Sequence, residues 1–280
     1  MEKIKVESII EKVDELPSLP HIVLKVMELT DDPDSTAFDI NQVINQDQNM
    51  TAQVLRMANS VYYGYSRRIA SVTDAIILIG FNAVRSIVLA ASMSKILKAE
   101  LKGYIMGEGE LWKHSQSAAI FARLLAKRVK FNSIETAYTA ALLHDIGKLV
   151  MNSYMSEAYQ EVIDTVNRDK IPFNKVEDSI FGFNHALIGG KIAEKWNLPA
   201  ELAEAITNHH DPSLSILNPS LTAIVHIADA VTLQMGMGLG IDGLLYELSD
   251  DALTLLGIGH HDLEILMAEI VDLLVDKDTF

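Results

Sequence analysis

The helical spacing of apolar side chains constrains the fold of this 280-residue chain more than any other feature. Apolar residues recur at helical intervals near both ends of the chain: Ile22, Val23, Val26 and Met27, and then Leu263, Leu266, Ile270 and Leu273. Strict alternation of apolar and polar residues, the pattern of a half-buried strand, never extends beyond a few residues. The sequence therefore predicts an all-α protein.

The longest apolar stretch, residues 75–93, raises the question of a membrane span. It contains Gly80, Asn82 and Arg85 near its middle, and a charged side chain at that depth of a bilayer is costly. We therefore interpret it as two helices buried in a protein core. The N-terminal segment MEKIKVESIIEKV has no apolar run of the kind found in secretory signals, so we expect a cytoplasmic protein.

Charge and cysteine content narrow the range of partners and ligands. The formal net charge is −15, which disfavours binding through phosphate backbones, so we expect neither nucleic acid nor anionic membrane as a partner. The chain has no cysteine, which excludes thiolate nucleophiles and cysteine-type zinc sites. Histidine and carboxylate side chains remain as the strong metal ligands.

Gly-rich residues 102–109 mark the best candidate for a boundary between two lobes, residues 1–102 and 103–280. One histidine precedes this boundary and eight follow it. This asymmetry predicts that the chemistry resides in the second lobe.

The second lobe carries an ordered series of histidine and aspartate residues, each on a predicted helix or at its end: His114, His144, Asp145, His185, His209, His210 and Asp229. Helices packed side by side could direct these side chains into one bundle interior, where α-helical proteins commonly build metal sites. Taken singly, each residue is more often a hydrogen-bonded core residue, a cap or a salt-bridge partner than a metal ligand. The pair in ALLHDIGK is the most specific element, because two buried ionisable groups are costly unless both are paired.

Imidazole and carboxylate ligands suit zinc, iron, manganese or nickel, so we expect one or two divalent ions of unassigned identity. His226 lies three residues before Asp229 and is expected to support a ligand rather than to act as one. His21, His260 and His261 occupy positions suited to solvent exposure or helix capping.

The series His114, His144-Asp145 and Asp229 resembles the H…HD…D signature of the HD superfamily of metal-dependent phosphohydrolases. His185 with His209 or His210 resembles the additional ligands of its dinuclear members. Three N-terminal segments, LPSLPHIVLKVMEL, INQDQNMTAQVLRMANSVYYG and SVTDAIILIGFNAVRSIVLA, resemble the HDOD family of HD-related output domains. The resemblance extends from about residue 10 to about residue 235.

This resemblance implies a bacterial, cytoplasmic signal-transduction protein, with an N-terminal HDOD lobe packed on an HD-like helical bundle and a protein partner. Many HDOD members resemble degenerate HD proteins that lack metal ligands, whereas every ligand position is filled in this chain. The resemblance therefore implies a metal site. The segment NSVYYGYSRRI has a composition common at contact surfaces, although a turn packed against the second lobe is the simpler explanation.

The alternative to a signal-transduction protein is a phosphohydrolase or phosphodiesterase that acts on a small phosphoester at a dinuclear metal centre. By this resemblance Asp145 bridges two ions, with His114, His144 and Asp229 on one ion and His185 with His209 or His210 on the other. Lys148 would stabilise the departing negative charge, and Glu110 is either a further ligand or a solvated first-turn acid. Cyclic di-GMP is a disfavoured substrate because no Gly-Tyr-Pro follows the paired histidines. A di-iron oxygenase, also known in the superfamily, would use the same ligands.

Overall fold

The computed structural model describes residues 19–60, 63–65, 67–154, 159–238 and 245–274. The N-terminal segment considered as a secretory signal lies outside these residues. Across the described ranges the regular structure is helical, and the only β-type pairing is an isolated bridge between Leu101 and Met106. The predicted all-α fold is confirmed. None of the described helices combines the length and the apolar character that a membrane crossing requires.

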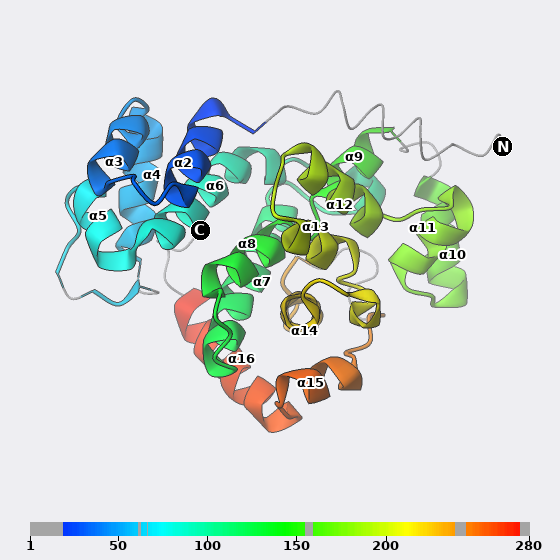
Figure 1. The fold of residues 1–280 in the computed structure, drawn as a ribbon. Helices are drawn as coiled ribbons and strands as arrows, with labels where there is room; N and C mark the ends of the chain where they lie inside the picture. Colours follow the sequence, from blue (N-terminus) through cyan, green and yellow to red (C-terminus); the bar gives the residue numbers. More distant parts are fainter. Residues whose placement is uncertain (1–18, 61–62, 66, 155–158, 239–244, 275–280) are drawn as a thin grey trace. The chain divides into compact units, whose positions relative to one another are not determined.

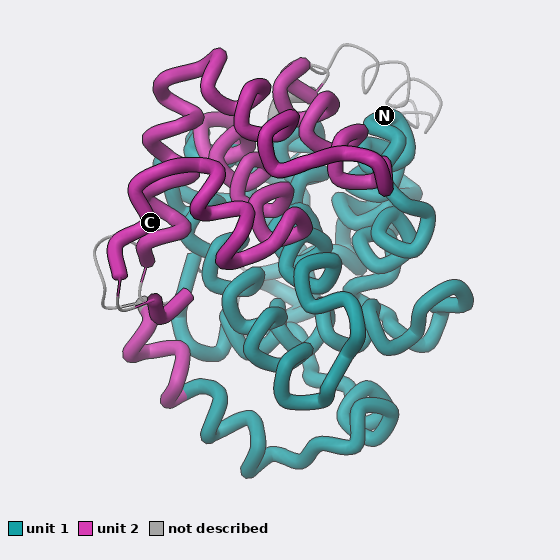
Figure 2. The backbone as a smooth tube through the Cα atoms, turned by 60° about the vertical axis from the view of Figure 1, so that its left-hand side comes forward, with its two compact units in different colours: residues 1–16, 97–267 teal, residues 17–96, 268–280 magenta. Residues whose placement is uncertain are grey.

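The chain divides into two compact units (Figure 2). Unit 1 comprises residues 1–16 and 97–267, and unit 2 comprises residues 17–96 and 268–280. The lobe boundary expected after residue 102 was based on glycine content rather than on compactness, and it stays a prediction. All the candidate ligands belong to unit 1.

Unit 2 is built from helices with clear sequence signals at their ends: α2 (His21–Asp31), α3 (Ala37–Ile44), α4 (Gln48–Ala58), α5 (Val72–Ile79) and α6 (Phe81–Leu97), whose last residue belongs to unit 1. Side chains of Thr36, Asp47 and Ser71 cap α3, α4 and α5 by accepting backbone N–H hydrogen bonds. Gly80, with φ of +86°, separates α5 from α6 and confirms that the apolar stretch forms two helices. The expected burial of this stretch is incomplete, because α5 leaves Ile77 69% exposed opposite its buried face.

Unit 1 contains the remaining helices: η2 (Lys102–Tyr104), α7 (Glu110–Arg128), α8 (Ile134–Leu143), α9 (Gly147–Tyr154), α10 (Tyr159–Asp169), α11 (Phe173–Phe181), α12 (His185–Lys195), α13 (Ala200–Thr207), η3 (Pro212–Leu214), α14 (Pro219–Gln234), α15 (Asp250–Leu256) and the start of α16 (His260–Leu274). Helix α14 packs against α7, α8, α13 and α15 and occupies the middle of the unit (Figure 1). Its residues 221–233 are all buried, as expected for a helix with neighbours on every side.

Close backbone contact brings α9 and α12 together beside the candidate ligands. A Cβ atom added to Gly147 would lie 1.9 Å from the carbonyl oxygen of His185 and 2.7 Å from the backbone nitrogen of Gly189. Glycine at position 147 therefore lets the start of α9, which follows His144 and Asp145, reach α12, which carries His185 at its start.

Candidate metal centre

The histidine and aspartate side chains singled out in the sequence meet inside unit 1. His114 lies on α7, His144 and Asp145 follow α8, and His185 begins α12. His209 and His210 follow α13, and Asp229 lies on α14. Ligand atoms lie within 4.8 Å of one another in three groups of residues: His114, His144 and Asp229; His185, His209 and His210; and His144, Asp145 and His209. One centre thus gathers residues that are separated by more than a hundred positions in the chain.

Asp145 lies between the first two groups and turns one carboxylate oxygen toward each. Its Oδ2 lies 3.5 Å from Nε2 of His114 and 3.4 Å from Nε2 of His144. Its Oδ1 lies 3.4 Å from Nε2 of His185 and 3.9 Å from Nε2 of His209. This is the position that a bridging carboxylate requires.

Hydrogen bonds on the outer side of four rings determine which nitrogen faces the centre. The Nδ1 atoms of His114, His144 and His209 lie 3.1, 2.6 and 2.7 Å from the backbone carbonyl oxygens of Met237, Ala141 and Ile206. Since a carbonyl can only accept, each Nδ1 donates, and the lone pair of a neutral ring resides on Nε2. Nδ1 of His185 likewise donates to a carboxylate oxygen of Glu177 at 2.6 Å, so its Nε2 also faces the centre.

Some of the buried atoms that face the centre have no hydrogen-bond donor beside them. Nε2 of His114 and Nε2 of His144 lie 3.2 Å apart, so two neutral rings would present lone pairs to each other. Nε2 of His209 and Oδ1 of Asp145 are buried with no hydrogen-bond partner. Divalent cations on the two sides of Asp145 would satisfy these atoms, whereas a purely structural core leaves Nε2 of His209 and Oδ1 of Asp145 unpaired at a cost of about 1–3 kcal/mol each. The residues therefore fit a metal centre.

The charges of the metal-free site are unevenly distributed. Burial disfavours the imidazolium form of His185, but the adjacent carboxylates of Glu177 and Asp145 prevail and raise its pKa to about 9. Burial, together with the neighbouring His144, lowers the pKa of His209 to about 3. Burial opposes ionisation of Asp145, yet Lys148 and His144 hold the pKa of this carboxyl well below its usual range. Without metal, a proton on His185 partly compensates the buried acids.

Glu177 is a functional residue that the sequence analysis missed. This fully buried side chain on α11 accepts hydrogen bonds from the backbone N–H of His185 at 2.9 Å and from its Nδ1 at 2.6 Å. Its other oxygen lies 2.5 Å from the hydroxyl of Tyr104 and 3.2 Å from that of Tyr159. The available signal was an acid on the apolar face of α11, one residue after the buried Val176.

Other residues expected near the centre have defined roles. Lys148 is 6% exposed, and its Nζ lies 2.7 Å from Oδ2 of Asp145. Glu110 belongs to none of the three ligand groups, and its carboxylate accepts the backbone N–H of Gly107 at 2.5 Å. Nδ1 of His226 donates to the carbonyl oxygen of His209 at 2.8 Å, while its Nε2 accepts the N–H of Ser249 at 3.0 Å. With both of its nitrogens engaged, His226 supports the paired histidines.

The three histidines assigned to solvent or capping positions lie away from the centre. His21 begins α2, and His260 and His261 begin α16. All three are exposed, and Nδ1 of His261 lies 3.4 Å from a carboxylate oxygen of Glu264.

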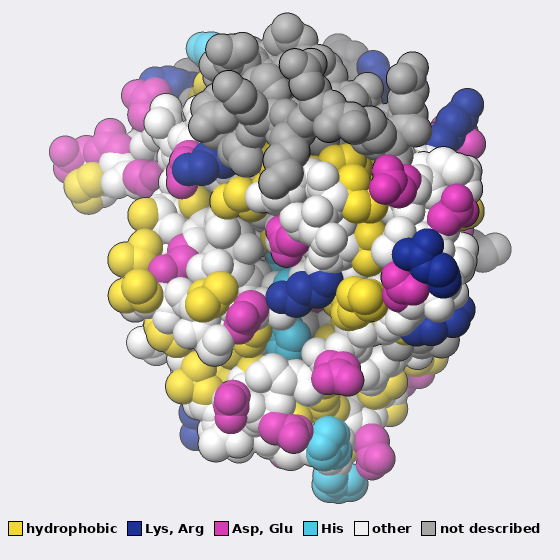
Figure 3. Space-filling view, turned by 90° about the vertical axis from the view of Figure 1, so that its right-hand side faces the viewer, with side chains coloured by type: hydrophobic (Ala, Val, Ile, Leu, Met, Phe, Trp, Pro, Cys, Tyr) yellow, Lys and Arg dark blue, Asp and Glu magenta, His cyan; other side chains and the backbone are white. Residues whose placement is uncertain are grey.

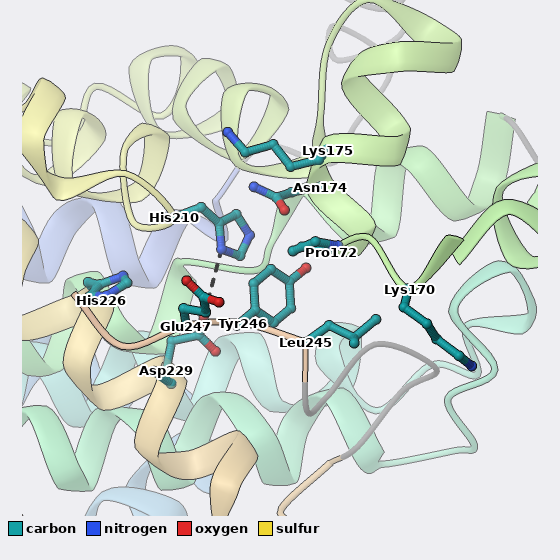
Figure 4. Close-up of a pocket in the computed structure, with 11 residues that line it drawn as sticks. Lys170, Pro172, Asn174, Lys175, His210, His226, Asp229, Leu245, Tyr246 and Glu247 are labelled. Carbon is teal, nitrogen blue, oxygen red and sulfur yellow. Dashed lines mark ion pairs between the residues drawn. The ribbon is translucent and has the colours of Figure 1, made fainter. Parts of the chain in front are cut away.

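A pocket of about 570 Å³ reaches the centre from the surface, and His210 and Asp229 form part of its wall (Figure 4). The ring of Tyr246 stacks on His210, with centroids 4.6 Å apart and an angle of 5° between the planes. In the space-filling view, histidine side chains are visible in the middle of one face, beside a cationic side chain (Figure 3). A ligand from solvent can therefore approach the candidate metal ligands.

The sequence matches the HDOD domain family over residues 16–212, and the chain belongs to this family. It is 26% identical to an uncharacterised protein of Treponema pallidum (strain Nichols) over 208 residues, which are 73% of this chain and 39% of that protein. It is 31% identical to ribonuclease Y of Petrotoga mobilis over 102 residues, which are 36% of this chain and 14% of that protein. The chain thus spans well under half the length of both curated relatives.

Solved structures show the same fold. An HDOD domain protein of unknown function from Geobacter sulfurreducens has a TM-score of 0.76 at 27% identity, covering 98% of this chain and 97% of that one. A candidate phosphohydrolase from Shewanella amazonensis SB2B has a TM-score of 0.74 at 23% identity, covering 97% of this chain and 95% of that one. The chain is therefore an all-α HDOD protein with histidine and aspartate side chains that could hold metal.

Proposed function

We propose that unit 1 of this protein binds two divalent metal ions and hydrolyses a phosphoester. The observation that carries this proposal is the position of Asp145, with one oxygen toward His114 and His144 and the other toward His185 and His209. The unpaired Oδ1 of Asp145 and Nε2 of His209 support it, because both are acceptors without a donor. Divalent ions at such a centre supply an acidified water and neutralise charge on a phosphoryl oxygen.

The protein's own side chains have complementary tasks in this proposal. Asp145 holds Lys148 at 2.7 Å, so the ammonium group stays beside the centre and would stabilise negative charge on a leaving oxygen. The carbonyl and carboxylate acceptors behind the four rings keep each Nε2 aimed inward. The pocket bounded by His210 and Asp229 admits a ligand, unlike a closed structural metal site.

Metal content and phosphodiester turnover test this proposal together. We expect elemental analysis to find two transition-metal ions per chain after reconstitution with manganese, and bis-p-nitrophenyl phosphate to be cleaved. Asp145→Asn should lose metal and activity, whereas Glu110→Gln, a carboxylate outside the ligand groups, should retain both. Full metal content in Asp145→Asn would contradict the bridging role, and a fully metallated wild type without turnover would contradict the hydrolase.

A signalling role with a protein partner is a second proposal, favoured by a groove in unit 2. This groove is lined by residues including Arg56, Tyr65 and Arg68. Neither arginine forms an ion pair within the described ranges, although the chain as a whole is strongly acidic. Asn59 holds the backbone of Ile69 through two hydrogen bonds of 2.8 Å and so fixes one side of the groove.

We propose that the groove receives an acidic segment of the partner protein. In-cell crosslinking should identify a partner that Arg56→Glu with Arg68→Glu no longer captures, whereas Lys25→Glu, outside this groove, still does. If the double arginine variant still crosslinks to the same partner as wild type does, this proposal is contradicted.

A further inference from the structure

The wall of the pocket beside the candidate metal centre contains a polar group that the proposed hydrolysis does not use. Asn174 lies on α11, is only 3% exposed, and lines the pocket with Lys175 and Tyr246. Figure 4 shows its amide between the Lys175 side chain and the Tyr246 ring, near His210. Asn174 therefore lies in the wall of the pocket close to the paired histidines.

The carbonyl oxygen of Asn174 is buried and has no hydrogen-bond partner in the described part of the chain. An unpaired buried acceptor is destabilising, and a leucine of similar volume would avoid that cost. An amide does not ionise, so the charge of the neighbouring centre does not account for it. The oxygen is placed to accept a hydrogen bond from a molecule in the pocket.

Charged side chains around the same pocket indicate the rest of the ligand. Lys170 and Lys175 lie exposed along its wall, and neither forms an ion pair with a described residue. In a chain with a net charge of −15, these two cations favour an anionic group. Glu247, also in the wall, offers further acceptors to a hydrogen-bond donor. The lining thus suits a molecule that combines phosphate with hydroxyl or amino groups.

We propose that this pocket selects phosphoesters of a hydroxylated organic group, through a hydrogen bond from that group to Oδ1 of Asn174. A volume of about 570 Å³ lies within the range of small-ligand sites and is large enough for a sugar phosphate or a mononucleotide. Both carry sugar hydroxyls and the phosphate on which the selection depends. The inference rests on the proposed phosphoester chemistry and assigns its substrate class.

Asn174→Leu tests the selection because it removes hydrogen bonding while nearly preserving volume. With the manganese-loaded full chain, calorimetry would give dissociation constants for inorganic phosphate, ribose 5-phosphate and AMP. We expect wild-type protein to bind the two esters more tightly than phosphate, and Asn174→Leu to reduce that preference about tenfold, as one lost hydrogen bond would. Ser179→Ala, an exposed change on the same helix, should leave the preference unchanged.

The outcomes separate this inference from the proposed hydrolysis. If wild type cleaves bis-p-nitrophenyl phosphate but binds neither ester better than phosphate, the substrate class is wrong and the hydrolase stands. If an ester preference depends on Asn174 without any phosphoester turnover, the hydrolase is wrong and the pocket binds its ligand for another purpose. An equal preference in Asn174→Leu and wild type would overturn the role of Asn174. Tighter binding of AMP than of ribose 5-phosphate would assign the pocket to nucleotides, and the reverse order would assign it to sugar phosphates.

Discussion

Replacing Glu177 with Gln should lower the free energy of unfolding of metal-free protein by about 2 kcal/mol at pH 7. The carboxylate lies 2.6 Å from Nδ1 of His185, and it raises the pKa of that ring from its ordinary 6.5 to about 9 against the opposing effect of burial. A pKa difference of this size corresponds to roughly 3 kcal/mol at low pH, most of which persists at pH 7. Asp145 contributes part of it, which leaves about 2 kcal/mol for Glu177.

The pH dependence of this loss has a definite sign. A histidine with a raised pKa binds more protons when folded than when unfolded, so its contribution is complete below pH 6.5. That contribution disappears as the pH rises through about 9, where the folded ring also loses its proton. The difference between wild type and Glu177→Gln should therefore shrink between pH 6.5 and 9.5. Only the smaller, pH-independent loss from the tyrosine contacts would remain.

Urea unfolding followed by tryptophan fluorescence measures this difference. Both tryptophans of the chain, Trp112 and Trp196, belong to unit 1, so the signal reports on the unit that contains Glu177. The titrations should contain EDTA and cover pH 6 to 9.5. Glu161→Gln, an exposed acid on α10, is the matched control and should change stability by less than about 0.5 kcal/mol. A stability difference that stays constant or grows with pH would refute the assignment of His185 as an imidazolium held by Glu177.

Three further outcomes are expected. Tyr104→Phe removes one hydroxyl donor to Glu177 and should cost about 1–2 kcal/mol in the same urea assay, so a neutral result would contradict the network. Gly147→Ala should cost about 3 kcal/mol in thermal unfolding, because the added Cβ would lie 1.9 Å from the His185 carbonyl oxygen. Gly107→Ala, which meets only ordinary contacts, should be tolerated. Manganese affinity measured by calorimetry should weaken as the pH falls from 9 to 7, since binding must displace the His185 proton, and binding without proton release would contradict this reasoning.

Much of the candidate centre follows from residue type and order along the chain. The unusual His144-Asp145 pair at the end of an apolar helix pointed to a partner for both groups, and the structure brings five further predicted residues around it. His226, expected from its spacing to support a ligand, donates a hydrogen bond to the backbone carbonyl oxygen of His209. These residues were recognisable because ionisable groups on apolar helices are costly unless they meet a partner.

Other parts of the centre depend on contacts that the chain order does not specify. Glu177 and Tyr104 are 73 residues apart, yet they share a 2.5 Å hydrogen bond behind His185. Asn174 carries no distinctive signal in the sequence, and it is the packing of α11 that buries it beside the pocket. Spacing along a helix indicates which face a residue occupies, but not which distant element covers that face.

By itself, the amino-acid sequence determined the helical class, the break at Gly80 and the chemical types available to a centre in a chain without cysteine. These properties depend on local periodicity, backbone freedom and composition, which act over a few residues. Only the tertiary structure decided which oxygen of Asp145 faces which histidines, which nitrogen of each ring points inward and which buried acceptors lack a partner. Those features arise where helices far apart in the chain pack within a few ångströms, and the free energy of that packing is a property of the whole core.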